Sequence, residues 1–321
     1  MFIYTEAYTI VSAIGYSIIG AIAIVIYLLF KDKDLKTRKM VLNVLTGVLL
    51  FLELLKQIQN IIPGFEYGSL WFWKKEGATF TAYALPFHLC SFFIFWPLAA
   101  FFTKGKVQDF FEKLTGTWAA LIFLSTVLYP EVIYGDALTS LYNGGPLTHT
   151  VVFHLLVCLY FLIVMALRPF KFELKKAWIP AVGILIYGLV AAPFAFIFKT
   201  NYCSIYEPHS FGFTIAVFEK FGYGLYLPLI ALLGCSAATI IYLIIIGMNK
   251  IIDLLRCPKG LLFGFSTLVV LLIPSGFIFK ACMGNNWNNM AFIFILLAML
   301  ILTCSIAILL VKYVFKKKDK N

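Results

Sequence analysis

The chain has 321 residues, of which 62% are hydrophobic and 13% are charged, and its formal net charge is +11. That charged fraction is about half the level of an ordinary soluble domain. A soluble fold could not hide so much apolar surface, because its outer layer must be largely polar. The composition therefore excludes a cytosolic enzyme, a disordered protein, a disulfide-rich secreted module and a nucleic-acid-binding domain.

Long apolar segments follow one another along the chain. A helix needs roughly 20 apolar residues to cross a hydrocarbon layer about 30 Å thick. A β-barrel would need alternating polar and apolar residues, whereas stretches such as 18–30 and 291–311 are continuously apolar. We therefore predict an all-α, polytopic membrane bundle of about nine transmembrane helices. The predicted spans are 7–30, 41–58, 84–102, 117–134, 150–167, 179–198, 224–248, 261–279 and 289–312.

The basic residues predict how these spans are oriented. Most of the 26 Lys and Arg residues fall in every second loop and in the C-terminal tail, whereas residues 135–150 contain none. Because Lys and Arg gather on the cytoplasmic side, the N-terminus is predicted outside and the C-terminus in the cytoplasm. The same residues explain the net charge, since they would meet anionic lipid headgroups. We expect a multi-pass plasma membrane protein whose partners are membrane lipids, with no nucleic acid among them.

Polar residues recur along the second predicted span at helical spacing. They are Asn43, Thr46, Glu53, Gln57 and Asn60. Such a stripe is expected to face the bundle interior, and an ionisable group inside a membrane is a candidate functional residue because its burial is costly. The alternative is a hydrogen-bonded seam between helices, in which Lys56 pairs with Glu53.

A cysteine and a histidine are predicted at similar depth near the outer leaflet. Cys90 follows His88 at the start of the third span, and His154 lies one to two turns inside the fifth span, below His149 at its mouth. Both spans are predicted to run from outside to inside. A thiol and an imidazole are the minimum for covalent acyl transfer, because the imidazole can remove the thiol proton.

Two other interpretations of these side chains stay open. A buried Cys is often a packing residue, and a membrane His is often only hydrogen-bonded. His88, His149, His154, Cys90 and Glu53 could also ligate a metal. No H-x-x-x-H or H-E-x-x-H spacing is present, so we expect neither a metal nor another cofactor.

Four short matches carry a resemblance to a known family. They are L-P-F-H-L-C at residues 85–90, close to the family's L-P-L-H-L-C, Glu53, the pair Phe153-His154, and Asn201-Tyr202 followed by Pro208. The chain resembles the YwaF family of bacterial integral membrane proteins over roughly residues 1–248. That family is distantly similar to a eukaryotic multi-span acyltransferase of ether phospholipids and to androgen-induced transmembrane ester hydrolases.

The resemblance implies acyl transfer or ester hydrolysis on lipids in a bacterial plasma membrane, with Cys90 as nucleophile and His154 as general base. It implies a transmembrane core over residues 1–248, followed by an additional helix pair and a basic tail over 249–321. The supporting or substrate-binding residues are His88, Glu53, His149, Gln57, Asn201 and Tyr202. Of these, His88 or Tyr202 would donate to the oxyanion, and Glu53 would orient a histidine. Glu207 stands where a Lys is expected.

A second function without covalent chemistry is a transporter or flippase for lipids or small molecules. The polar stripe and the histidines would then line a path or relay protons. Such a path needs polar groups through the midplane and the inner half, whereas these cluster toward the predicted outer side. A structural or assembly protein would bring none of these side chains to a common cavity.

Overall fold

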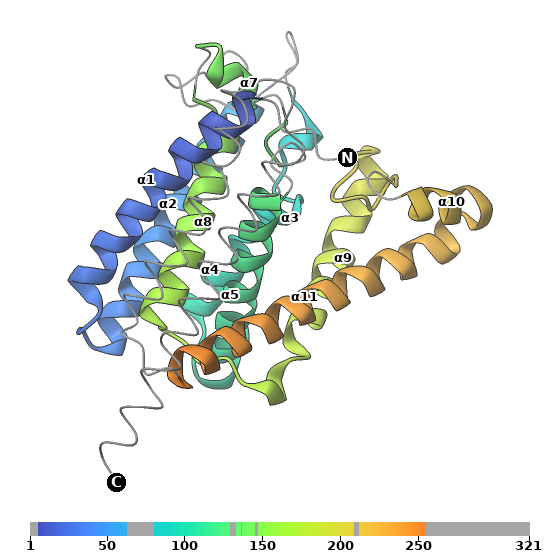
Figure 1. Cartoon of the computed structure of the whole chain (residues 1–321). Helices are drawn as coiled ribbons and strands as arrows, with labels where there is room; N and C mark the ends of the chain where they lie inside the picture. Colours follow the sequence, from blue (N-terminus) through green and yellow to red (C-terminus); the bar gives the residue numbers. More distant parts are fainter. Residues whose placement is uncertain are drawn as a thin grey trace, which may run out of the picture. The chain divides into compact units, whose positions relative to one another are not determined.

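The computed structural model describes residues 6–62, 80–128, 133–135, 137–144, 147–208 and 212–254 (Figure 1). Every regular element in these residues is a helix, which confirms the predicted fold class. Five described segments are long and apolar enough to cross a membrane. They contain helices α1 (Glu6–Phe30), α2 (Leu35–Ile61), α8 (His149–Leu167), α9 (Ile179–Phe198) and α11 (Tyr223–Leu254).

Two predicted spans differ from the observed helices. The segment 84–102 is interrupted and contains the end of η1 (Ala82–Ala84), then α3 (Leu89–Phe92) and α4 (Phe95–Phe102). Helix α5 (Gly105–Leu128) begins well before the predicted residue 117, because its first turns are polar and do not belong to an apolar run. The predicted spans 261–279 and 289–312 lie outside the described residues, so the total of nine helices and the orientation stay predictions.

Local signals set several helix ends. The Asp34 carboxylate accepts a hydrogen bond of 3.0 Å from the Thr37 N–H at the start of α2, as an N-cap residue does. The hydrogen bond from the Thr37 side chain, together with the one from its backbone N–H, lowers the pKa of Asp34. Helices α8 and α9 are followed by the C-cap residues Arg168 and Lys199, whose left-handed φ values of 46° and 48° turn the chain out of the helix.

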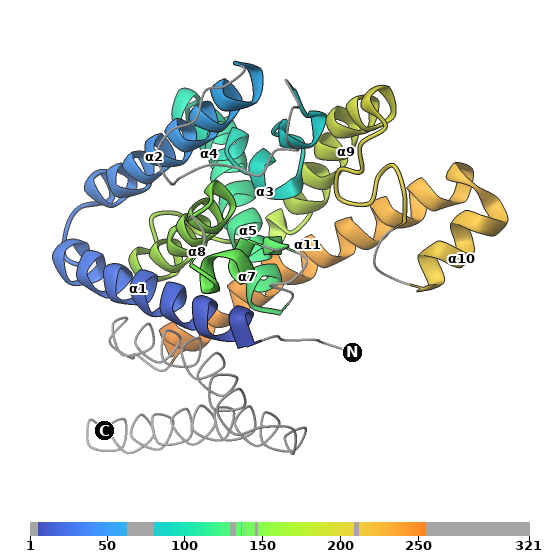
Figure 2. The same cartoon turned by 90° about the horizontal axis from the view of Figure 1, so that it is seen from above.

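The chain divides into two compact units. Of the described residues, the first unit comprises those within 6–39, 123–169 and 247–254, and the second comprises those within 40–122 and 170–246. Within the first unit α1 packs along α8, and the short helix α7 (Ala137–Tyr142) lies against both (Figures 1 and 2). Gly15 permits this approach, since a Cβ there would come within 3.0 Å of the Leu155 side chain.

The second unit has an aromatic core between α4, α5 and α9. Trp118 is fully buried, and its ring centroid lies 5.3 Å from that of Trp96 and 6.0 Å from that of Tyr187. Gly183 of α9 faces Trp118 and Leu114 of α5, where a side chain would clash. Large aromatic side chains thus fill the space between these helices, and a glycine lets their backbones approach.

The buried face of α2 agrees with most of the predicted polar stripe. Thr46, Glu53 and Asn60 are buried and Gln57 is half-buried, but Asn43 is exposed. The prediction was wrong for Asn43, because Leu42 and Leu45 occupy the buried face in that turn. The polar interior of this helix is therefore concentrated in its second half.

Candidate functional site

The residues around Cys90 form an irregular stretch of backbone between helices. Leu85 and His88 have extended backbones with ψ values of 151° and 145°, and α3 starts only at Leu89. Backbone at membrane depth that leaves a helix must find hydrogen-bond partners within the protein. We call residues 81–91 the broken segment, and its partners define the candidate site.

Helix α2 holds the broken segment through consecutive polar side chains. The Asn60 amide donates to the Thr81 carbonyl at 3.0 Å and accepts from the Thr81 N–H at 2.9 Å. Gln57 Nε2 donates to the Ala84 carbonyl at 2.7 Å. Lys56 Nζ donates to Ser91 Oγ at 3.3 Å. The second half of the polar stripe is therefore the surface to which both ends of this segment bind.

Other elements of the same unit hold the carbonyls between these ends. The Tyr202 hydroxyl, just after α9, donates to the Ala82 carbonyl at 2.5 Å. The Tyr187 hydroxyl of α9 donates to the Phe87 carbonyl at 2.9 Å. Trp118 Nε1 of α5 donates to the Leu89 carbonyl at 3.0 Å. Side chains from four separate parts of the chain thus fix the backbone that leads to Cys90.

Cys90 is a half-buried thiol, outside any disulfide, at the second residue of α3. His88 is the N-cap of that helix and has the extended backbone that is usual at this position. The His88 ring centroid lies 4.3 Å from that of Tyr83 and 5.1 Å from that of Tyr202, both in edge-on contact. The structure therefore brings His88, Cys90 and Tyr202 into one neighbourhood.

Glu53 and Lys56 form a buried ion pair beside the broken segment. Lys56 Nζ lies 2.7 Å from Glu53 Oε1, and the two side chains are 8% and 5% exposed. Gln57 Nε2 also donates to Glu53 Oε1, at 2.8 Å. The predicted pairing of Lys56 with Glu53 is thus confirmed. The role of Glu53 in orienting a histidine stays a prediction.

The two histidines of α8 belong to the first unit. His154 Nδ1 lies 2.7 Å from the Thr150 carbonyl oxygen, which can only accept, so Nδ1 carries the hydrogen. In the neutral ring Nε2 is then the nitrogen that can take up a proton. The His154 ring makes an edge-on contact with Tyr134 at 5.5 Å, and His149 stacks on Phe153 at 5.3 Å.

Cys90 and His154 fall in different compact units, so their pairing stays a prediction. In the described parts of the chain, no three His, Cys, Asp or Glu side chains come together as a group that could hold a metal ion.

Asn201 shapes the loop that carries Tyr202. Its amide donates to the Glu207 carbonyl at 2.9 Å and accepts from the N–H groups of Tyr206 and Glu207 at 3.2 and 3.3 Å. The loop also contains left-handed backbones at Cys203 and Ser204, with φ values of 50° and 62°. Asn201 therefore acts on the site through the position of Tyr202. The Glu207 backbone, rather than its side chain, takes part in this loop.

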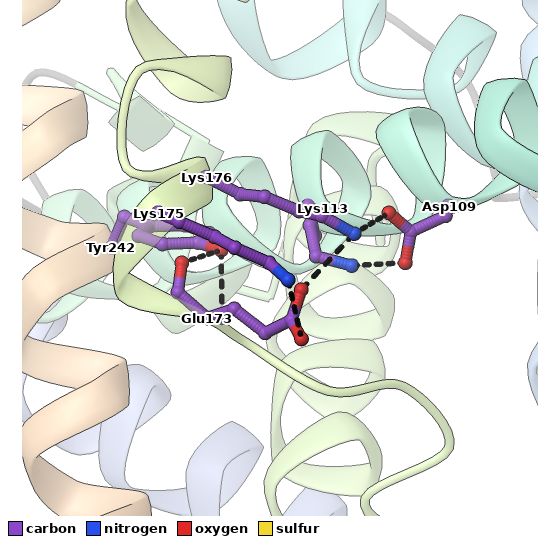
Figure 3. Close-up of polar contacts among 6 residues, drawn as sticks. All are labelled: Asp109, Lys113, Glu173, Lys175, Lys176 and Tyr242. Carbon is purple, nitrogen blue, oxygen red and sulfur yellow. Dashed lines mark hydrogen bonds and ion pairs between the residues drawn. The ribbon is translucent and has the colours of Figure 1, made fainter.

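A second polar cluster in the same unit was not anticipated from the sequence. Figure 3 shows the Asp109 carboxylate between Lys113 and Lys176, with Glu173 also paired to Lys176. The Tyr242 hydroxyl donates to the Glu173 carbonyl at 3.0 Å and accepts from its N–H at 3.1 Å. In the sequence these lysines are indistinguishable from the other lysines of the loops predicted to face the cytoplasm. Only the four-residue spacing between Asp109 and Lys113 could have indicated an ion pair.

The ionisable groups of this cluster have shifted pKa values. Burial raises the pKa of Asp109, but hydrogen bonds from Lys113 and Lys176 outweigh it, so the pKa falls below 3.8. The hydrogen bond from Lys176 lowers the pKa of Glu173 below 4.5. Burial lowers the pKa of Lys113, although Asp109 opposes this shift. Opposite charges therefore keep both carboxylates ionised.

The chain has several helices long and apolar enough to cross a membrane, and side chains of the protein bind the polar backbone groups of the broken segment. These two features define a multi-pass helical membrane protein. The model of the TMEM164 family matches residues 3–249, and the chain belongs to this family. The expectation of a multi-span membrane protein family is thereby confirmed. The family that matches is the TMEM164 family, and the resemblance to the YwaF family is not supported by a match. No curated protein and no solved structure matches the chain.

Proposed function

We propose that this protein is a membrane-embedded lipid acyltransferase or ester hydrolase, with Cys90 as nucleophile and His154 as general base. The observation that carries the proposal is the immobilised backbone before Cys90, where side chains from several helices bind successive carbonyls. A nucleophile must be held within a fraction of an ångström of its attacking position. The broken segment provides such support for a single half-buried thiol.

The proposed reaction needs two proton transfers in each half. His154 Nε2 takes the thiol proton, and the Cys90 sulfur attacks the ester carbonyl carbon. The bond from that carbon to the ester oxygen breaks, and His154 returns the proton to the departing alcohol. His154 then removes a proton from a lysolipid hydroxyl or from water, whose oxygen attacks the thioester. The carbon–sulfur bond breaks and the sulfur regains the proton.

The supporting residues take distinct roles in this proposal. The Tyr202 hydroxyl donates its hydrogen to the Ala82 carbonyl and therefore has no second hydrogen for the oxyanion. Its role is to hold the broken segment. His88 lies two residues before Cys90 and is the better donor to the oxyanion, the negative oxygen that forms during attack. His149 is the first residue of α8, between one and two turns before His154, and would line the path by which the substrate reaches the site. The substrates would be ester lipids of the outer leaflet of a bacterial plasma membrane, and anionic headgroups would contact the cytoplasmic face.

A labelling experiment tests the chemistry directly. Purified protein in lipid nanodiscs is incubated with a radiolabelled long-chain p-nitrophenyl ester, and the thioester on Cys90 is detected by its sensitivity to hydroxylamine. We expect labelling of the wild type and of Cys235→Ala, a control that removes another half-buried free thiol. Cys90→Ala and His154→Ala should not label. Unchanged labelling of Cys90→Ala and His154→Ala would overturn the proposal.

The transporter alternative predicts a different result for one conservative change. Cys90→Ser keeps the size and polarity of the side chain but replaces the thiol with a far weaker nucleophile. An enzyme would lose most of its ester turnover. A transporter would keep moving fluorescent lipid across vesicle membranes at nearly the wild-type rate.

A further inference from the structure

We infer that Lys56 is a positioning residue of the active site, which acts through Ser91 to hold the turn of α3 that carries Cys90. The inference rests on the proposed function and adds a residue that the sequence identified only as a partner of Glu53. Its basis is the hydrogen bond of 3.3 Å from Lys56 Nζ to Ser91 Oγ. Ser91 is the residue directly after Cys90.

The first step concerns the cost of this arrangement. The Lys56 and Glu53 side chains are 8% and 5% exposed, and α2 is one of the helices that can cross the membrane. Burying two charges costs several kcal/mol per ion, and replacing such a pair by apolar residues is often neutral or stabilising. Packing alone therefore does not explain an ammonium at this position. A role in fixing the neighbouring turn does explain it.

The second step concerns what holds the ammonium in place. Glu53 Oε1 accepts from both Lys56, at 2.7 Å, and Gln57, at 2.8 Å. Glu53 thus orients the two side chains that bind the broken segment at Ser91 and at the Ala84 carbonyl. The buried carboxylate, the ammonium and the amide form one connected unit on α2.

The third step concerns Ser91. Trp118 Nε1 donates to the carbonyl of Leu89, the residue before Cys90, and Lys56 Nζ donates to the hydroxyl of Ser91, the residue after it. Trp118 therefore fixes the residue before Cys90 in the sequence, and Lys56 fixes the residue after it. Removing the second contact leaves the thiol attached to a turn that can rotate, and a misplacement of about 1 Å can lower a rate about 100-fold.

The test is a double-mutant cycle on steady-state ester turnover. Lys56→Met and Ser91→Ala should each lower kcat about 10- to 100-fold with KM changed less than about twofold, since binding of the acyl chain is untouched. The double variant should be no slower than the slower single variant, because both changes remove one contact. Lys56→Arg, which keeps the charge and a donor, should recover much of the lost kcat.

The control is a buried lysine that pairs with a carboxylate elsewhere in the same unit. Lys113 bonds to Asp109 on α5, with its side chain 1% exposed, and Lys113→Met should keep the wild-type kcat. Thermal unfolding verifies that each variant is folded, and Ser91→Ala tests the contact without disturbing a charge. Wild-type kcat in folded Ser91→Ala and Lys56→Met, with Cys90→Ala inactive, would overturn this inference alone. Full turnover by Cys90→Ala would overturn the proposed function instead.

Discussion

The side-chain amide of Asn60 pairs with the backbone amide and carbonyl of Thr81 through hydrogen bonds of 2.9 and 3.0 Å. Asn60 is fully buried. This pairing replaces the partner that the Thr81 backbone would have in a regular helix, and it fixes where the broken segment begins. The position of Cys90 therefore depends on a side chain of α2, thirty residues earlier in the sequence.

The first prediction concerns this pair. Asn60→Ala leaves the Thr81 N–H without this partner, while the Thr81 carbonyl keeps only the hydrogen bond from the Ala84 N–H. An unsatisfied buried group costs about 1–3 kcal/mol. We expect a clear fall in the thermal unfolding midpoint in detergent. The control is Asn43→Ala, which removes the exposed asparagine of the same helix and should change the midpoint little. Equal effects of the two substitutions would contradict the assigned role of Asn60.

The second prediction separates the hydroxyl of Tyr202 from its ring. Tyr202→Phe removes the hydrogen bond to the Ala82 carbonyl but keeps the edge-on contact with His88. It should cost about 0.5–1.5 kcal/mol, the net contribution of one hydrogen bond, since the Ala82 carbonyl keeps the bond from the Leu85 N–H. Tyr202→Leu also removes the ring contact and should lower stability further. Unfolding in detergent, followed by intrinsic fluorescence, measures both. A Phe variant as stable as the wild type would show that this hydroxyl does not hold the segment.

The helical architecture was predictable because each apolar run must bury its backbone polar groups in a helix to enter a membrane. The pairing of Glu53 with Lys56 was also predictable, because residues three apart share a helix face. The break before α3 was not anticipated. Pro86 is equally compatible with the first turn of a helix, and the partners that stabilise the broken form, Trp118 and Tyr187, are distant in sequence.

The sequence indicated which residues belong to the candidate site, but not which contacts these residues make. The polar stripe indicated where α2 is not facing lipid, but nothing in its spacing indicates that Gln57 binds the Ala84 carbonyl. Asn201 was selected with Tyr202 by resemblance, and the structure shows that the asparagine folds its own loop. Such local roles depend on loop backbone conformation, which side-chain periodicity does not encode.

The third prediction concerns the tautomer of His154. Because Nδ1 donates to the Thr150 carbonyl, the neutral ring should carry its hydrogen on Nδ1. Nitrogen NMR of protein labelled at histidine, recorded in alkaline buffer, should show an unprotonated Nε2 for this residue. His154→Ala identifies the signal by its disappearance. If the hydrogen were on Nε2, this nitrogen could not accept the Cys90 thiol proton, and the proposed reaction would be contradicted.

The fourth prediction concerns pH and the second polar cluster. The folded-state pKa values of Asp109 and Glu173 lie below 3.8 and 4.5. Groups with lowered folded-state pKa values add stability that is present above the unfolded values and lost as pH falls through the folded values. The unfolding midpoint should therefore decrease below about pH 4.5. Asp109→Asn should lower stability at neutral pH, because the buried Lys113 ammonium loses its carboxylate partner, and it should flatten the decrease in acid.

The fifth prediction compares two glycines of α9. At Gly183 an added Cβ would meet Leu114 and lie 3.2 Å from the Trp118 ring, whereas at Gly188 nothing lies within 4 Å. Gly183→Ala should cost about 1–3 kcal/mol because it overfills the interface with α5. Gly188→Ala should be neutral or stabilise by up to about 1 kcal/mol, because Ala favours a helix more than Gly. Thermal unfolding of the two variants measures the difference. Since Trp118 also binds the Leu89 carbonyl, Gly183→Ala should in addition slow ester turnover, and a normal rate in a destabilised variant would show that the core and the candidate site are uncoupled.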